Sequence, residues 1–397
     1  MPICLFCDNE LDVKTRPEHV LLSALGGRKT SRRVVCSECN GQFGSTIDKE
    51  LAESVSMLRA KLGHESGAGK PPPKSQYRST HGMITVDNNG RSRFKQKPFA
   101  VQREGSELAV TLAGDDFDHL MKNLRHLAAY LKCEPEHLLS MLKEDNGKGI
   151  VETFAPVPSE RGRLAVGGEA CSRSISKSCL ELLALQVGNE ALHAPVFAAA
   201  RAFVMHGNST FNVDRVFLDT RPLPNEAEIR AQYGPAFHMV CVANDRAGAV
   251  RGYFRLYGYI AWSVLLAETS QLANVSVCLI CNPVNGKWTE DIGQFGDANA
   301  EWLSDARFNQ RQATEWLSSV LQHAYELQLE RAVGRLVRDE FLRHGIEGDR
   351  TAGEEIKQKV IGEISARVSA LVLRLPYERA VAWETVEKAL ALTRGNV

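Results

Sequence analysis

The sequence predicts an α+β protein with a compact metal-binding unit at its N-terminus, a mixed α+β middle and a largely helical C-terminal region. Three observations lead to this prediction. Two C-x2-C pairs lie near the start of the chain. The stretch ESGAGKPPPKS then passes from Gly and Ser to three prolines, which is typical of a linker between domains. After it, strand-like and helical patterns are mixed until about Glu301, and from there the pattern is helical.

A chain of 397 residues favours two or three domains, because single hydrophobic cores stop growing below that size. We expect four consecutive segments: residues 1–65, a linker at 66–76, a mixed domain at 77–300, and a helical region at 301–397.

The composition is that of an ordinary globular protein, with 44% hydrophobic residues. The 48 basic and 48 acidic residues cancel, so no global field indicates a nucleic-acid binder, although a local basic patch can still bind phosphate. The start, MPICLFCDNE, lacks the pattern of a signal peptide. The longest apolar run, YIAWSVLLA, is shorter than the ~20 residues that a membrane span needs. We therefore expect a cytoplasmic protein with reduced thiols and no membrane segment.

Within the N-terminal unit, GSTIDKELAESVSMLRAKLG predicts a helix. Ile47, Leu51, Val55 and Leu58 recur at helical spacing and form its buried face.

The middle of the chain has both kinds of element. MITVDNNGRSRF predicts a hairpin around Asn-Gly, and DDFDHLMKNLRHLAAYLKC predicts a helix with Leu120, Leu124, Leu127 and Leu131 on one face. Two more helices are expected at 174–188 and 191–206. FHMVCVA, GYFRLYGYIAWSVLLAE and VSVCLIC read as strands, and the helical C-terminal region has expected breaks near Gly345, Asp349–Gly353 and Pro376.

Cys4, Cys7, Cys36 and Cys39 predict a zinc site. Two C-x2-C turns supply four thiolates, which complete a tetrahedron around zinc and leave no open coordination position. The zinc is therefore expected to be structural, in a unit too small for a large core. The 28 residues between the pairs exceed the usual zinc-ribbon spacing, so a hairpin-sized insertion must lie between them.

This insertion contains the motif that suggests a function. The pattern C-x2-C, then EHV-x-x-x-A-L-G-G, then C-x2-C-N-x-x-F-G resembles the HNH nucleases of the ββα-metal type, in the branch braced by a four-cysteine zinc, over Ile3 to Leu62. The resemblance implies that His19 is the general base that takes a proton from the attacking water. It also implies that Glu18 and Asn40 hold one divalent ion, usually Mg²⁺.

The motif departs from the family pattern in three places. Glu18 stands where Asp is commoner, and Asn40 replaces the last His while keeping an oxygen ligand. The stretch TSRRVV lacks the middle Asn that braces the catalytic hairpin, which leaves a backbone carbonyl as the candidate support for His19. Asp48, two helical turns after Asn40, is either a further ligand that reaches the same metal through water or an ordinary solvated acid.

Arg28, Lys29, Arg32 and Arg33 form a basic cluster beside the expected site. These four cations either contact DNA backbone phosphates without reading sequence or form a solvated basic turn, and Lys14 and Arg16 extend the patch.

Other candidate motifs favour structural roles. The second C-x2-C pair, Cys278 and Cys281, lies in an apolar strand with no partner pair nearby, and Cys241 is similar, so buried thiols are expected there. His119 and His126 lack a completing ligand, and Gly167–Gly168 is too short for a phosphate loop. Trp262 and Trp288 are expected in the core rather than in a base-stacking platform.

Three functional hypotheses follow. The leading one is a Mg²⁺-dependent DNA endonuclease or nickase whose residues 77–397 sense a ligand, find a target or dock onto a protein partner, in a layout similar to effectors of bacterial anti-phage defence. The second is a catalytically inert, zinc-stabilised nucleic-acid-binding or adaptor protein. The third is a nuclease that residues 76–397 hold inactive until a partner or ligand arrives.

Overall fold

The computed structural model describes residues 2–79, 82–88, 92–94, 97–105, 107–113, 117–145, 150–154, 166–272, 274–283, 289–293, 295, 301–344, 346, 353–373 and 375–381. The chain forms two compact units. The first comprises Met1–Ser75, Val86–Gly90 and Arg163–Tyr325, and the second comprises Gln76–Thr85, Arg91–Gly162 and Glu326–Val397. These units differ from the four consecutive segments expected from the sequence, because the N-terminal residues share their interior with residues beyond 163. The α+β class is confirmed.

The N-terminal part of the first unit is a short hairpin followed by helices. The hairpin pairs β1 (Glu18–His19) with β2 (Thr30–Ser31) across η1 (Ser23–Leu25). The helices are α1 (Ser37–Ser45), α2 (Ile47–Ser54) and α3 (Ser56–Leu62). The predicted helical face is confirmed, since Ile47, Leu51, Val55 and Leu58 are all buried, although the pattern is divided between α2 and α3.

A six-stranded antiparallel sheet forms the core of the first unit. Its strand order is β14-β13-β10-β11-β12-β9. The bounds are β9 (Val216–Leu218), β10 (His238–Asn244), β11 (Val250–Leu256), β12 (Ile260–Ala267), β13 (Ser276–Asn282) and β14 (Thr289–Gly293). The strands predicted from FHMVCVA, GYFRLYGYIAWSVLLAE and VSVCLIC are β10, β11 with β12, and β13.

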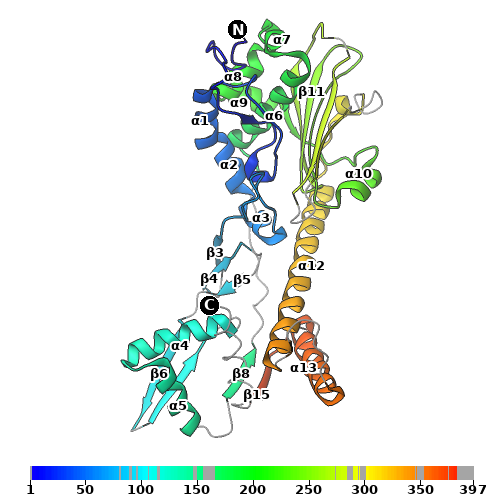
Figure 1. The fold of residues 1–397 in the computed structure, drawn as a ribbon. Helices are drawn as coiled ribbons and strands as arrows, with labels where there is room; N and C mark the ends of the chain where they lie inside the picture. Colours follow the sequence, from blue (N-terminus) through cyan, green and yellow to red (C-terminus); the bar gives the residue numbers. More distant parts are fainter. Residues whose placement is uncertain are drawn as a thin grey trace. The chain divides into compact units, whose positions relative to one another are not determined.

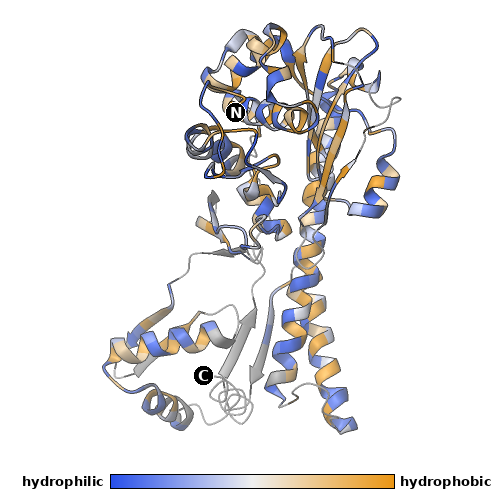
Figure 2. Ribbon diagram, turned by 45° about the horizontal axis from the view of Figure 1, so that its top comes forward, coloured by the Kyte–Doolittle hydropathy of each residue, from blue (hydrophilic) through white to orange (hydrophobic). Residues whose placement is uncertain are grey.

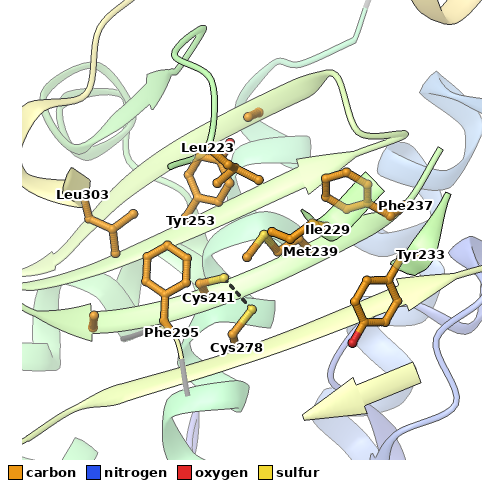
Figure 3. Packing of buried hydrophobic residues seen from close by; sticks show 12 residues of the cluster. Leu223, Ile229, Tyr233, Phe237, Met239, Cys241, Tyr253, Cys278, Phe295 and Leu303 are labelled. Atoms are coloured by element: carbon orange, nitrogen blue, oxygen red, sulfur yellow. Dashed lines mark hydrogen bonds between the residues drawn. The ribbon is translucent and has the colours of Figure 1, made fainter. Parts of the chain in front are cut away.

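The central strands β10, β11 and β12 are largely buried on both faces of the sheet. One face carries an apolar cluster in which Met239, Cys241 and Tyr253 pack with Phe295 and Leu303 (Figure 3). The opposite face receives α6 (Glu169–Val187). Gly252 permits this approach, because a Cβ there would lie 2.6 Å from the sulfur of Cys179 on α6.

Helix α6 lies between α2 and the sheet (Figure 1). Most of its 19 residues are buried, which is unusual for a helix that carries both Lys and Glu. The other helices of this unit are α7 (Asn189–Leu192), η2 (Pro195–Phe197), α8 (Ala198–His206), α9 (Ser209–Arg215), α10 (Glu226–Tyr233) and η3 (Leu303–Asp305), of which α7, α8 and α9 contact α6. The helix expected at 191–206 is interrupted by Pro195, which lacks the N–H that a continuous helix needs.

The second unit combines small sheets with helices. Strands β3 (Ser75–Ser79), β4 (Gly82–Val86) and β5 (Ser92–Phe94) form one sheet, β6 (Phe99–Glu104) pairs with β7 (Glu107–Leu112), and β8 (Ile150–Phe154) pairs with β15 (Tyr377–Val381). The helices are α4 (Phe117–Leu131), α5 (Pro135–Asp145), α12 (Gln310–Arg343), which begins in the first unit, and α13 (Glu354–Leu373).

The predicted leucine face of α4 is confirmed by Leu124 and Leu127, which are buried against β6 and β7. In Figure 2, α4 shows both hydrophobic and hydrophilic stretches, as expected of a helix with one buried face. The C-terminal region is largely helical, as predicted, and β15 adds one strand. The Asn-Gly step of the expected hairpin and the breaks at Gly345 and 349–352 lie outside the described residues. None of the described helices is long and apolar enough to cross a membrane.

Candidate metal centre and active site

The four predicted cysteines come together in one cluster. Cys7 Sγ lies 3.6 Å from Cys36 Sγ and 3.5 Å from Cys39 Sγ, and the backbone N–H of Cys36 donates to Cys4 Sγ over 3.3 Å. All four sulfurs lie within 4.8 Å of one another. Sulfur atoms that each bind zinc at about 2.3 Å in a tetrahedron are separated by about 3.8 Å, so the cluster fits a zinc ion.

A divalent ion would also favour the thiolate form of these cysteines. A hydrogen bond from Cys39 lowers the pKa of Cys4 to about 5, while burial raises the pKa of Cys7 to about 11. Four adjacent thiolates repel one another, and a divalent ion removes this repulsion. Cys4, Cys7, Cys36 and Cys39 are therefore compatible with the predicted structural zinc.

The first helix places Asn40 beside the strand that carries Glu18 and His19. In the β1–β2 register, Glu18 is opposite Ser31 and His19 is opposite Thr30. The Asn40 amide on α1 donates a 3.1 Å hydrogen bond to the carbonyl of Pro17, the residue before Glu18. This contact fixes the start of α1 beside the strand that carries the Glu-His step.

The two glycines of ALGG close the loop between the strands. Gly26 has φ +93°, a conformation that side chains rarely adopt, and a Cβ on it would lie 2.3 Å from Pro283. A Cβ on Gly27 would lie 1.9 Å from the carbonyl oxygen of Leu21. Both positions therefore require glycine.

Glu18 is bound by a lysine from the middle of the chain. The Glu18 side chain is only 9% exposed, and its carboxylate lies 2.6 Å from Nζ of Lys177 on α6. The same ammonium lies 3.0 Å from Asp48 and 3.5 Å from Glu181, and the Lys177 side chain is fully buried. The Ser174 hydroxyl donates a 2.6 Å hydrogen bond to Asp48. Glu18, Asp48 and Glu181 therefore share one internal cation.

The pKa values in this cluster follow from burial and charge. Burial raises the pKa of Glu18, and the positive charge of Lys177 opposes that shift. Burial also raises the pKa of Glu181 well above its usual range. Desolvation alone would lower the pKa of Lys177, but Asp48, Glu181 and Glu18 together raise it above its ordinary value. Lys177 is therefore charged at neutral pH.

His19 is half-buried beside this cluster. Burial lowers its pKa, and the nearby charge of Lys177 lowers it further, so the ring is neutral and able to accept a proton at pH 7. The backbone carbonyl expected to support the His19 ring in place of the missing middle Asn stays a prediction.

The donor set of Glu18 and Asn40 fits a magnesium-like ion in chemistry. A carboxylate and an amide carbonyl are both hard oxygen ligands. The Glu18 carboxylate, however, already contacts an ammonium, and Asp48 faces that ammonium and Ser174. Lys177 thus supplies the countercharge that a metal would supply at Glu18.

The four cations of the basic cluster are exposed but not equivalent. The guanidinium of Arg32 donates to the carbonyls of Val13 (3.1 Å) and Thr15 (3.0 Å), so this side chain braces the loop before Glu18. Arg28 and Lys29 are exposed before β2, and Arg33 is exposed after it.

Among the described residues, the remaining motifs have the structural roles expected of them. Cys241 and Cys278 face each other across β10 and β13 with their sulfurs 2.9 Å apart, both buried. They belong to no group that could hold a metal in the described part of the chain. Trp262 is 3% exposed and therefore a core residue, while Trp288 lies outside the described residues.

Sequence reasoning missed two groups of polar and charged residues. One is the set from α6, Ser174, Lys177 and Glu181, whose only signal was an i,i+4 Lys–Glu pair in a run of serines and apolar residues, SISKSCLELL. The other is in the second unit, where Glu340, His344 and Glu363 lie within 4.8 Å of one another. There Arg367 already pairs with Glu340, which explains the cluster as an ion-pair network between α12 and α13.

Comparison with known proteins supports the assignment of the N-terminal segment alone. No curated protein and no solved structure matches the chain. Residues 4–56 match the family model described as HNH endonuclease. This segment contains the four-cysteine cluster, the Glu-His step and Asn40. The N-terminal segment is therefore similar to HNH endonuclease domains over residues 4–56.

Proposed function

We propose that this protein is a metal-dependent DNA endonuclease in which His19 is the general base. The observation that carries the proposal is the placement of His19, half-buried next to Glu18 and within a hairpin that Asn40 ties to α1. The lowered pKa of His19 keeps its ring neutral at physiological pH, which is the protonation state that a base needs.

The proposed reaction is hydrolysis of a phosphodiester bond. A ring nitrogen of His19 accepts a proton from the water that attacks phosphorus, and the P–O bond to the leaving sugar oxygen breaks. Glu18 and Asn40 would hold a divalent ion, Mg²⁺ in the simplest case, which when bound stabilises the negative charge that develops on the phosphate. One such site makes one cut, so a single chain would nick duplex DNA.

Plasmid cleavage tests the proposal. Supercoiled plasmid is incubated with the full-length, zinc-loaded protein and Mg²⁺ or Mn²⁺, and open-circular and linear products are separated on a gel. We expect wild type to accumulate open circles and His19→Ala to lose this activity. His206→Ala, which removes an exposed histidine at the end of α8, is the matched control. Identical topoisomer patterns for wild type and His19→Ala would overturn the catalytic role.

A second candidate is an inert nucleic-acid-binding or adaptor module. The observation in its favour is the ammonium of Lys177 on the carboxylate of Glu18. It predicts DNA binding that is indifferent to His19→Ala and no cleavage with any metal. Cleavage that disappears in His19→Ala would exclude it.

We also propose that the remaining chain directs the domain in a defence role, on the basis of its layout alone. A small nuclease domain has little need of the other residues for cutting. Plating efficiency of phages on bacteria that express wild type or His19→Ala provides the measurement, with equal plating on both contradicting the role.

A further inference from the structure

We propose that Lys177 is an internal cation that competes with a divalent metal for the carboxylate of Glu18. Metal binding at the nuclease site would then require the lysine to release Glu18. The inference rests on the proposed function, because it takes Glu18 as a metal ligand.

Lys177 and Glu18 are in direct contact. The Lys177 ammonium lies 2.6 Å from a Glu18 oxygen, which is hydrogen-bonding distance for a charged pair. Its side chain has no exposed surface, so no water substitutes for the carboxylates around it. A metal cation that binds Glu18 therefore has to displace the Lys177 ammonium and not water.

Three carboxyl groups, those of Glu18, Asp48 and Glu181, surround the single ammonium of Lys177. Both Glu181 oxygens are buried without a hydrogen bond among the described groups, although one lies 3.5 Å from Lys177. Removing the ammonium leaves buried carboxylates uncompensated, which is costly. A divalent cation would relieve that cost, so the site without Lys177 is expected to bind metal more tightly.

The packing of α6 holds Lys177 in place. It projects from α6, which packs on β10 and β11, and Ser174 one turn earlier on the same helix binds Asp48. Two contacts from a helix buried in the first unit therefore reach the acids of the N-terminal domain. Release of Glu18 has to break its contact with Lys177 while α6 stays packed. Without metal, Lys177 is therefore expected to stay bound to Glu18.

The test measures Mn²⁺ binding to the zinc-loaded, full-length protein, by the loss of the free Mn²⁺ signal in electron paramagnetic resonance. If about one molecule in ten has Glu18 available, the apparent dissociation constant is raised about tenfold. Lys177→Met removes the charge and keeps the length of the side chain. We expect it to bind Mn²⁺ about tenfold more tightly than wild type and to gain more thermal stability when Mn²⁺ is added.

Lys49→Met is the matched control. Lys49 is next to Asp48 in sequence, but its side chain is 58% exposed and pairs only weakly with Glu53 at 3.9 Å. This variant removes the same charge near the site without vacating Glu18, so its Mn²⁺ affinity should equal that of wild type.

Two further variants separate a loss of folding from a loss of metal binding. Lys177→Met/Glu181→Gln removes the buried acid next to Lys177 together with the ammonium, so it leaves fewer uncompensated carboxyls than the single variant, and the same gain in affinity is expected. Equal or weaker Mn²⁺ binding in a folded Lys177 variant would overturn the competition. If Glu18→Gln leaves Mn²⁺ affinity unchanged in both backgrounds, Glu18 is not a ligand and the proposed function itself fails. Affinity that is lost in Glu18→Gln but unaffected by Lys177→Met refutes the competition alone.

Discussion

The side-chain amide of Asn189 donates a 2.9 Å hydrogen bond to the carbonyl of Val34, two residues before the zinc-cluster residue Cys36. It also donates to the carbonyl of Ile3 over 2.6 Å, just before Cys4. One buried amide at the start of α7 therefore links both cysteine turns to the helices beyond residue 163.

We expect Asn189→Ala to destabilise the zinc cluster. The carbonyls of Ile3 and Val34 each lose one hydrogen bond, although that of Val34 keeps the N–H of Leu5, and the loss of the two bonds costs about 1–3 kcal/mol. The measurement is the rate of zinc release to a chromogenic chelator, with thermal melting alongside. Glu190→Ala, at the exposed neighbouring position of α7, is the control and should behave as wild type. Zinc release at the wild-type rate from Asn189→Ala would contradict the structural link.

The exposed cations should act on DNA through charge alone. Lys29→Ala/Arg33→Ala is expected to weaken DNA binding and to reduce the salt dependence of the binding constant by about 0.9 per removed cation. Fluorescence anisotropy of a labelled duplex at several salt concentrations measures this. Arg32→Ala behaves differently, because Arg32 binds the carbonyls of Val13 and Thr15, and its main effect should be a lower melting temperature. An unchanged salt slope in the double variant would mean that these residues do not contact phosphates.

The two C-x2-C pairs should differ in metal content. Cys36→Ser is expected to lose the zinc, since it breaks a four-sulfur cluster, and to unfold the N-terminal domain. Cys278→Ser should keep about one zinc ion per chain, because Cys278 faces only Cys241 in the apolar face of the sheet. Zinc content by atomic absorption distinguishes the two variants. A loss of zinc in Cys278→Ser would show that this second pair binds metal after all.

His238 gives the stability of the first unit a specific pH dependence. Burial, helped by the charge of Arg59, lowers its pKa to about 3, and its Nδ1 accepts a hydrogen bond from the backbone N–H of Tyr257. The unfolded chain binds a proton near pH 6.5, so stability is complete above that pH and falls as pH drops toward 3. This single group should remove about 2 kcal/mol between pH 7 and pH 5.

His238→Gln tests this, because its amide oxygen can still accept from Tyr257 but does not titrate. Urea unfolding at pH 7 and pH 5 should show a smaller loss in the variant than in wild type. His206→Gln, which alters an exposed histidine, should lose as much as wild type. Equal losses in wild type and His238→Gln would rule out His238 as the source.

The parts of the fold that could be predicted from sequence are those encoded locally. The cysteine spacing was sufficient for the metal cluster, and the four apolar residues of helical spacing were sufficient for the buried face of α2 and α3. Strands β10 to β13 could be predicted because apolar runs rich in β-branched and aromatic residues favour buried strands.

The contacts that were missed join distant parts of the chain. Lys177 lies 159 residues from Glu18, and neither residue type nor local spacing relates the two. The pattern SISKSCLELL indicates a helix, but one lysine in such a run is ordinarily exposed, and only the packing of α6 between α2 and the sheet makes it buried. The composition of the two compact units could not be predicted for the same reason, since a linker rich in Pro indicates a boundary along the chain and not which segments pack together.

The placement of Lys177 on α6 limits how the N-terminal segment can be transferred to other proteins in evolution. A cassette made of residues 1–65 alone would carry Glu18 and Asp48 into a new protein without the cation that balances them. Recombination that shuffles this domain between chains must therefore move α6 with it or supply another positive group. In descendants of this chain, positions 18 and 177 should change together, and a carboxylate at the first should be accompanied by a basic residue at the second.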